Sequence, residues 1–135
     1  MMLGYLLARA GAPVTVLEKH NDFCRDFRGD TVHPSTLELM FELGLLEDFL
    51  KIPHQQLTSV GGVFGDFAFR TADFRYVPAH CRFIALMPQW DFLNFLSARA
   101  RSFPAFDLRM QHEAVDLIRD RGRVTGVVRA HPGEP

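Results

Sequence analysis

The spacing of apolar residues near the start of the chain changes from a helical period to a strand within residues 3–18. Four apolar residues recur at i, i+3, i+4 and i+7 and so share one helical face: Leu3, Leu6, Leu7 and Ala10. Gly11 suits the left-handed residue just past a helix end, and Pro13 opposes any further helix. The apolar, β-branched run 14–17 then predicts a buried parallel strand, and Glu18 follows where that strand leaves its sheet.

The remaining pattern predicts helices in two places and strands between and after them. Helical spacing covers residues 34–50, with a break at Gly44, and residues 89–101. Pro34 suits the first helical turn, and Ser35 with Glu38 matches a capping box. Runs typical of strands cover 57–64, 66–76, 82–87, 106–110, 114–119 and 123–130. This order predicts a mixed α/β fold with an antiparallel part inserted in it.

Glu18 occupies the position at which a dinucleotide-binding unit places an acidic residue. In such a unit the carboxylate accepts hydrogen bonds from a ribose hydroxyl, roughly 20 residues after a glycine-rich turn. That turn and the strand before it are absent, because the chain starts within the helix. An ordinary helix–strand pair with a solvated Glu18 explains the stretch equally well, so both interpretations remain open at this point.

Composition narrows the class of protein without naming a function. The chain has 135 residues, of which 47% are hydrophobic and 23% charged, which is typical of a globular domain and not of a disordered one. A net charge of −1 without a basic stripe argues against nucleic acid as a partner. The two cysteines have no metal-ligand spacing, and no apolar run approaches a membrane span, so we expect a cytoplasmic protein without a metal site.

Two further polar positions could contact a nucleotide. Arg28 lies in a polar loop after the predicted nucleotide-binding strand, where a guanidinium could neutralise a pyrophosphate. Gln89 opens a helix directly after a buried strand, so its amide could reach a ligand over the strand end. A solvated loop and a polar first-turn residue are the simpler explanations. Neither the carboxylates nor the histidines form a convincing acid–base or metal-binding set.

Three segments together resemble one protein family. They are LGYLLARAGAPVTVLEK (3–19), RDFRGDTVHPSTLELMFELGLLEDFL (25–50) and MPQWDFLNFLSARAR (87–101). The pattern is similar to the FAD-dependent aromatic hydroxylases, the single-component flavoprotein monooxygenases related to p-hydroxybenzoate hydroxylase. The strand VTGVVRA (124–130) also fits. The resemblance implies a partial FAD-binding, Rossmann-like (two-dinucleotide-binding) α/β fold with an inserted antiparallel segment of the substrate domain.

The resemblance also implies a role for five residues. Glu18 would bind the ribose of the FAD adenosine, and Lys19 would lie beside it near the adenine. Arg28 would approach the ribityl-pyrophosphate portion, and Gln89 would hydrogen-bond the FAD linker. The backbone around Val115 would contact the adenine. No residue in the chain would be the chemical catalyst.

On this resemblance the chain divides into three parts. Residues 1–56 would be a partial FAD-binding unit, 57–87 would be strands of the substrate side, and 88–135 would return to the FAD-binding domain. The substrate would be a small phenol-like ring, hydroxylated with NAD(P)H and O2.

Several motifs of the family are missing, including the glycine-rich turn and two later Asp-containing motifs. We therefore expect a fragment that is not active by itself, in which the apolar surface of the first helix favours aggregation or a homodimer. Two alternatives remain: another FAD oxidoreductase such as a halogenase relative, and a non-catalytic α/β binding or interaction module. A halogenase would need a lysine between flavin and substrate, and only Lys19 and Lys51 exist.

Overall fold

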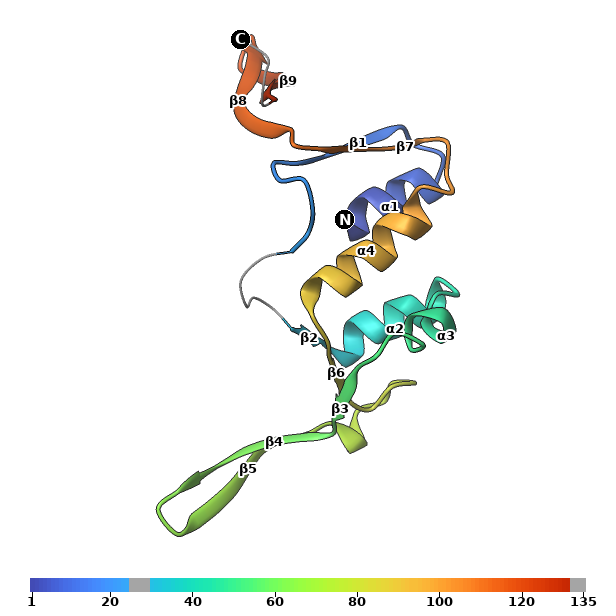
Figure 1. The fold of residues 1–135 in the computed structure, drawn as a ribbon. Coiled ribbons are helices and arrows are strands. Elements are labelled where there is room, and N and C mark those ends of the chain that lie inside the picture. Colours follow the sequence, from blue (N-terminus) through green and yellow to red (C-terminus); the bar gives the residue numbers. More distant parts are fainter. Residues whose placement is uncertain (25–29, 132–135) are drawn as a thin grey trace. The chain divides into compact units, whose positions relative to one another are not determined.

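The computed structural model describes residues 1–24 and 30–131 and has a mixed α/β fold, as the sequence predicts (Figure 1). The chain divides into two compact units, a first unit of Met1–Cys24 with Leu93–Pro135 and a second unit of Arg25–Phe92. The first unit contains α1 (Met2–Arg9), β1 (Val14–Glu18), β7 (Phe106–Met110), β8 (Glu113–Asp120) and β9 (Arg123–Ala130). The second contains β2 (Thr31–Val32), α2 (Pro34–Glu42), α3 (Leu46–Phe49), β3 (Gln55–Leu57), β4 (Ser59–Phe64), β5 (Phe67–Asp73), η1 (Phe74–Tyr76) and β6 (Ile84–Leu86). Helix α4 (Gln89–Ala100) begins in the second unit and ends in the first.

Helix α1 packs closely on the strand pair β1–β7 of the first unit (Figure 1). Gly4 makes this approach possible, because a Cβ there would come within 2.7 Å of Val16 Cγ2 and 3.1 Å of the Phe106 ring. Tyr5, on the same helix, is buried and meets the ring of Phe103 edge-on at 5.5 Å between centroids. Gly11, with φ of +79°, ends the helix as its sequence position predicts.

Strands β1 and β7 run parallel, in a register that sets Val14 opposite Phe106 and Glu18 opposite Met110. The parallel strand predicted at 14–17 is therefore present. Its side chains are only half-buried, however, whereas the apolar run predicted a buried strand. The reason is that β1 has a neighbour on one edge only among the described residues.

The β8–β9 hairpin forms where the sequence predicts it. Arg121 and Gly122, at the turn, have φ of 46° and 81°, which is the left-handed pair that a two-residue hairpin turn requires. Both faces of the hairpin are largely exposed, and its apolar residues include Val115 and Ile118.

The second unit has its core between helices α2 and α3 and the antiparallel sheet β2–β6–β3. Fully buried side chains come from all of these layers: Leu37, Met40, Phe49 and Ala85. The Phe49 ring also meets Phe92 edge-on at 5.7 Å. Strand β2 and the first two residues of β3 lie in stretches that the sequence did not predict as strands, because two or three residues carry too little periodicity to be recognised. The strand predicted for 57–64 is divided, since Leu57 belongs to β3 and the rest of the run forms β4.

The start of helix α2 corrects one prediction. Pro34 occupies the first turn as expected, but the capping box of Ser35 and Glu38 does not form. His33 is the N-cap residue, without a side-chain cap hydrogen bond, and the Glu38 carboxylate instead accepts hydrogen bonds from His80. The predicted pattern was wrong here because the helix begins two residues before a capping box with Ser35 as its N-cap would place it.

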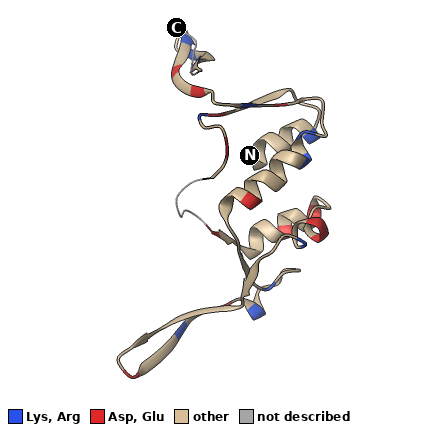
Figure 2. Ribbon diagram, in the orientation of Figure 1, with Lys and Arg blue, Asp and Glu red and all other residues tan. Residues whose placement is uncertain are grey.

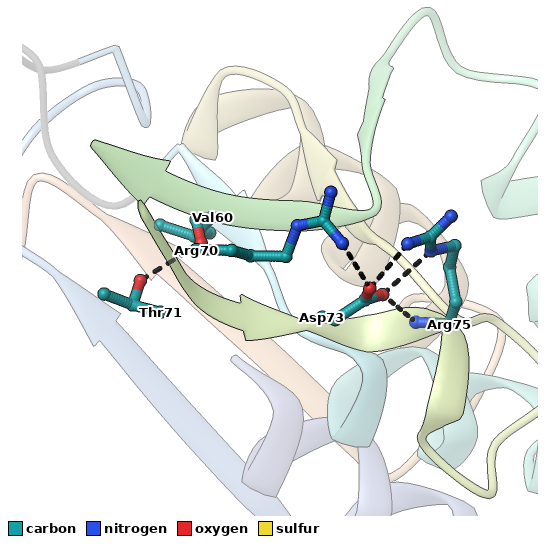
Figure 3. A network of polar contacts seen from close by, with 5 residues as sticks. All are labelled: Val60, Arg70, Thr71, Asp73 and Arg75. Atoms are coloured by element: carbon teal, nitrogen blue, oxygen red, sulfur yellow. Dashed lines mark hydrogen bonds and ion pairs between the residues drawn. The ribbon is translucent and has the colours of Figure 1, made fainter. Parts of the chain in front are cut away.

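Strands β4 and β5 form a separate hairpin that turns at Gly65, with φ of +59°. The strand predicted for 66–76 ends at Asp73, because the Asp73 carboxylate accepts a hydrogen bond from the Arg75 amide and starts the 3-10 turn η1 (Figure 3). Gly61 lies in β4 beside a register shift, where any Cβ would collide with the backbone oxygen of Phe69.

Candidate functional site

The carboxyl end of β1 places Glu18 in a segment that is tied to the end of β7. The Glu18 carboxylate oxygen Oε1 accepts a hydrogen bond from the His20 amide at 2.9 Å. The main-chain oxygen of Glu18 accepts a hydrogen bond from the His112 amide, and the main-chain oxygen of His20 accepts one from the Gln111 amide, both at 2.9 Å. These bonds hold a half-buried carboxylate at the end of a parallel pair, which is where open α/β sheets bind their ligands.

Lys19, the residue after Glu18, links this segment to the start of β8. Its ammonium nitrogen lies 3.8 Å from a carboxylate oxygen of Glu113, and both side chains are 55% exposed. An exposed ion pair of this kind is worth about 0–1 kcal/mol, so it can give way to a ligand at little cost. Val115 follows two residues later on β8 and is exposed. The structure thus brings Glu18, Lys19 and the beginning of β8 together.

Gln89 belongs to the second unit and is the first residue of α4, with an exposed side chain. The strand–helix junction before it is fixed, because the Met87 amide donates to the Asp30 oxygen at 3.0 Å and the Asp91 amide donates to the Pro88 oxygen. Arg28, the remaining predicted cofactor contact, lies outside the described residues.

A cleft of about 450 Å³ lies beside this junction, wholly within the second unit. Its walls come from the residue before β2, the loop into β3, and the end of β6: Asp30, Pro53, His54, Gln55, Leu86, Met87 and Pro88. Sequence reasoning did not single out His54, because one histidine between a helix and a strand carries no motif. The sequence feature that could have drawn attention to His54 is its position between Pro53 and the polar pair Gln55–Gln56, just before strand β3.

A second polar cluster ties the loop before β6 to helix α2. The Glu38 carboxylate accepts hydrogen bonds from the His80 amide at 2.9 Å and from His80 Nδ1 at 2.8 Å, while the His80 ring stacks on Phe41. The hydrogen bond from the His80 amide, together with that from its ring, lowers the pKa of the Glu38 carboxyl. The partners lie 42 residues apart, so no local pattern predicts the pairing.

The base of the β4–β5 hairpin holds a third cluster, shown in Figure 3. The Asp73 carboxylate accepts hydrogen bonds from the Arg75 side chain at 2.6 and 2.9 Å and from Arg70 at 3.1 Å. The Arg75 guanidinium holds the pKa of the Asp73 carboxyl well below its usual range, so Asp73 is ionised and fully engaged. This cluster stabilises the hairpin and offers no acid or base.

The rest of the described chain adds no further type of site. Lys and Arg are scattered over several elements and do not gather along any one of them (Figure 2). Residues 1–24 and 30–131 contain no group of three His, Cys, Asp or Glu side chains that could hold a metal. No helix among those residues has the length and hydropathy needed to cross a membrane.

Comparison with known families gives one match over the whole chain. Residues 1–135 match the family model described as an FAD binding domain.

Two curated proteins from Streptomyces are also similar. The 6-methylpretetramide 4-monooxygenase of Streptomyces rimosus is 27% identical over 138 residues, which cover 95% of this chain and 31% of that protein. The rifampicin monooxygenase of Streptomyces venezuelae is 32% identical over 125 residues, which cover 93% of this chain and 25% of that protein. The chain therefore spans about a third or less of the relatives that it matches.

Solved structures share the fold. PqsL of Pseudomonas aeruginosa, a probable FAD-dependent monooxygenase, matches with a TM-score of 0.76 and 19% identity over 95% of this chain and 34% of that one. The myxobacterial chondrochloren halogenase CndH matches with a TM-score of 0.79 and 19% identity over 97% of this chain and 30% of that one. At such identities the likeness concerns the fold alone.

Proposed function

The chain belongs to the FAD binding domain family, within the FAD-dependent monooxygenases, and from this premise we propose that it forms part of the FAD site of an enzyme that hydroxylates a phenol-like ring with NAD(P)H and O2. The chain spans only part of its relatives, so the hydroxylation belongs to the proposal. The Rossmann-like arrangement and the division into 1–56, 57–87 and 88–135 belong to it as well.

The position of Glu18 carries the proposal. A carboxylate accepts hydrogen bonds, and a ribose offers hydroxyl donors, so the chemistry of the group fits the adenosine portion of FAD. Glu18 lies at the carboxyl end of a parallel strand. The backbone that carries it is fixed by hydrogen bonds from the amides after β7 to the main-chain oxygens of Glu18 and His20. The Glu18 carboxylate itself accepts a hydrogen bond from the His20 amide. A carboxylate fixed in this way needs little reorganisation when a diol approaches.

Each unit contributes further proposed contacts with the cofactor. Lys19 lies beside Glu18 and would border the adenine, which the backbone around Val115 would contact along β8. Gln89 would donate its amide hydrogens to the linker of the cofactor from the start of α4. Arg28 would reach the ribityl-pyrophosphate portion. Bound FAD would supply the redox chemistry, while these residues bind and orient it.

Titration of the 135-residue chain with FAD tests the proposal. We expect saturable binding that Glu18→Gln weakens about 10-fold, because the substitution removes the charge from a charge-assisted hydrogen bond but keeps the shape. Glu42→Gln, an exposed carboxylate on α2, is the matched control and should leave affinity unchanged. Absence of saturable binding, or equal loss in both variants, would contradict the proposal. Without the rest of the enzyme we expect no NAD(P)H oxidation by the FAD-loaded chain.

A halogenase relative is the second candidate, because the chondrochloren halogenase has the same fold over nearly all of this chain. The only lysines are Lys19, which pairs with Glu113, and Lys51, which pairs with Asp48 on an exposed helix end. Neither borders the cleft beside Gln89. This favours the monooxygenase proposal over a halogenase that acts through a lysine.

A further inference from the structure

The open cleft beside the start of α4 has the size and lining of a site for a small ring. Its volume of about 450 Å³ lies within the range of roughly 300–1,000 Å³ typical of small-molecule sites. Apolar groups form most of its lining, from Pro53, Leu86, Met87 and Pro88. Among the residues that the structure describes, the lining also includes Asp30 and contains neither a Lys nor an Arg.

The tautomer of His54, in the same lining, is fixed by a backbone group. His54 Nδ1 lies 2.7 Å from the main-chain oxygen of Ile52. A carbonyl oxygen can only accept, so Nδ1 must carry the proton. In the neutral ring, Nε2 is therefore an acceptor.

The acceptor on Nε2 is only weakly engaged within the protein. The Gln56 amide nitrogen lies 3.4 Å from it, a distance longer than a good hydrogen bond, and Gln56 is an exposed side chain that can move away. The His54 ring also lies nearly parallel to that of Phe83, with an interplanar angle of 10° and 6.2 Å between the ring centroids. His54 is half-buried and belongs to the lining of the cleft, and an acceptor with a fixed tautomer suits a ligand that carries one hydroxyl donor.

We propose that this cleft binds the hydroxyl-bearing aromatic ring of the substrate and that His54 Nε2 accepts the hydrogen bond from the ring hydroxyl. The inference rests on the proposed function, because that function supplies an aromatic substrate for a site next to Gln89. It makes His54 the residue that distinguishes a phenol from the same ring without a free hydroxyl. The Ile52 carbonyl acts as a positioning group, because it selects the tautomer.

A comparison of phenol with its methyl ether, anisole, tests the assignment on the full 135-residue chain at pH 8. The two rings share shape and apolar surface, and only phenol has a donor. We expect phenol to bind about fivefold more tightly than anisole, the ratio that one net hydrogen bond gives. The His54→Asn variant, whose side-chain amide can still donate to the Ile52 oxygen, should bind both rings equally.

His80→Asn, a histidine of the same unit outside the cleft, is the matched control and should keep the fivefold preference. Nitrogen NMR of labelled histidines in the unsubstituted chain gives a measurement that does not depend on any variant. Phenol should shift the His54 Nε2 resonance and anisole should not. Equal affinities for the two rings, or an unmoved Nε2 resonance, would overturn the assignment.

FAD offers hydroxyl groups of its own, so it is titrated separately. A His54 Nε2 shift caused by FAD and not by phenol would assign the histidine to the cofactor and overturn the inference. FAD binding without a preference for phenol would leave the proposed function standing and remove only the role of His54. A preference for phenol without FAD binding would instead separate the cleft from the proposed function.

Discussion

At the scale of single residues, the chemistry of the second unit depends on side chains that the fold brings together from distant positions. Glu38 illustrates this point, because a residue expected to cap its own helix instead accepts two hydrogen bonds from His80. The ring stacking of His80 on Phe41 holds the donor in place. The cluster thus fastens the loop before β6 to helix α2.

The lowered pKa of Glu38 predicts a pH dependence of stability. Its folded-state pKa lies below its ordinary value of 4.5, so the interaction stabilises the fold above about pH 4.5 and is lost as the pH falls through the folded-state pKa. Glu38→Gln should therefore lower the free energy of unfolding most at neutral pH, and the difference from the parent chain should shrink below pH 4.5. Urea denaturation across pH 3–7 measures this difference in the free energy of unfolding. A difference that does not change with pH would contradict the prediction. The control variant Glu42→Gln should show no pH-dependent difference from the parent chain.

Residue pairs also mark the limit of what the sequence could predict. Glu18 and Gln89 were predicted as cofactor contacts because each follows a recognisable strand, and both stay predictions. His54 and the Glu38–His80 pair escaped notice, because their meaning depends on a cleft and on a contact between residues 42 apart. Local patterns carry no information on such contacts until the elements are packed.

At the scale of elements, the close approach of α1 to β1 and β7 depends on the absence of a side chain at one position. The helices and most strands follow local periodicity and turn residues, and the sequence predicted them for that reason. Local sequence patterns could not predict the pairing of β1 with β7, because the facing residues of these strands lie 92 positions apart.

Substitution of Gly4 by Ala tests this contact between helix and sheet. The added Cβ would lie 2.7 Å from Val16 Cγ2, so α1 or the strand must shift, at a cost of about 1–3 kcal/mol. The better helix propensity of Ala offsets about 1 kcal/mol of this. We expect a net loss of stability in thermal or urea unfolding. Leu3→Ala, at an exposed position of the same helix, should change stability by less than about 0.5 kcal/mol, and an equal effect of both would refute the contact.

At the scale of the whole molecule, the proposed ligand should contribute to stability through mass action. At an FAD concentration of 100 times Kd, binding to the folded state adds about 2.7 kcal/mol. A 10-fold weaker Glu18→Gln variant at the same concentration should gain about half as much. Thermal unfolding with and without FAD should therefore show a rise in Tm of several degrees that the substitution roughly halves. Equal shifts in both proteins would contradict the role of Glu18.

The parallel pairing of β1 with β7 has a consequence for how the chain folds. Their facing residues are separated by 92 positions, so the pair can form only after a long loop has closed, which is slow and entropically unfavourable. Most of the intervening chain belongs to the second unit, whose hairpin and helices depend on nearer partners. We expect those local contacts to form early and to shorten the loop that remains. The strand end that carries Glu18 would then be among the last parts of the chain to become ordered during folding.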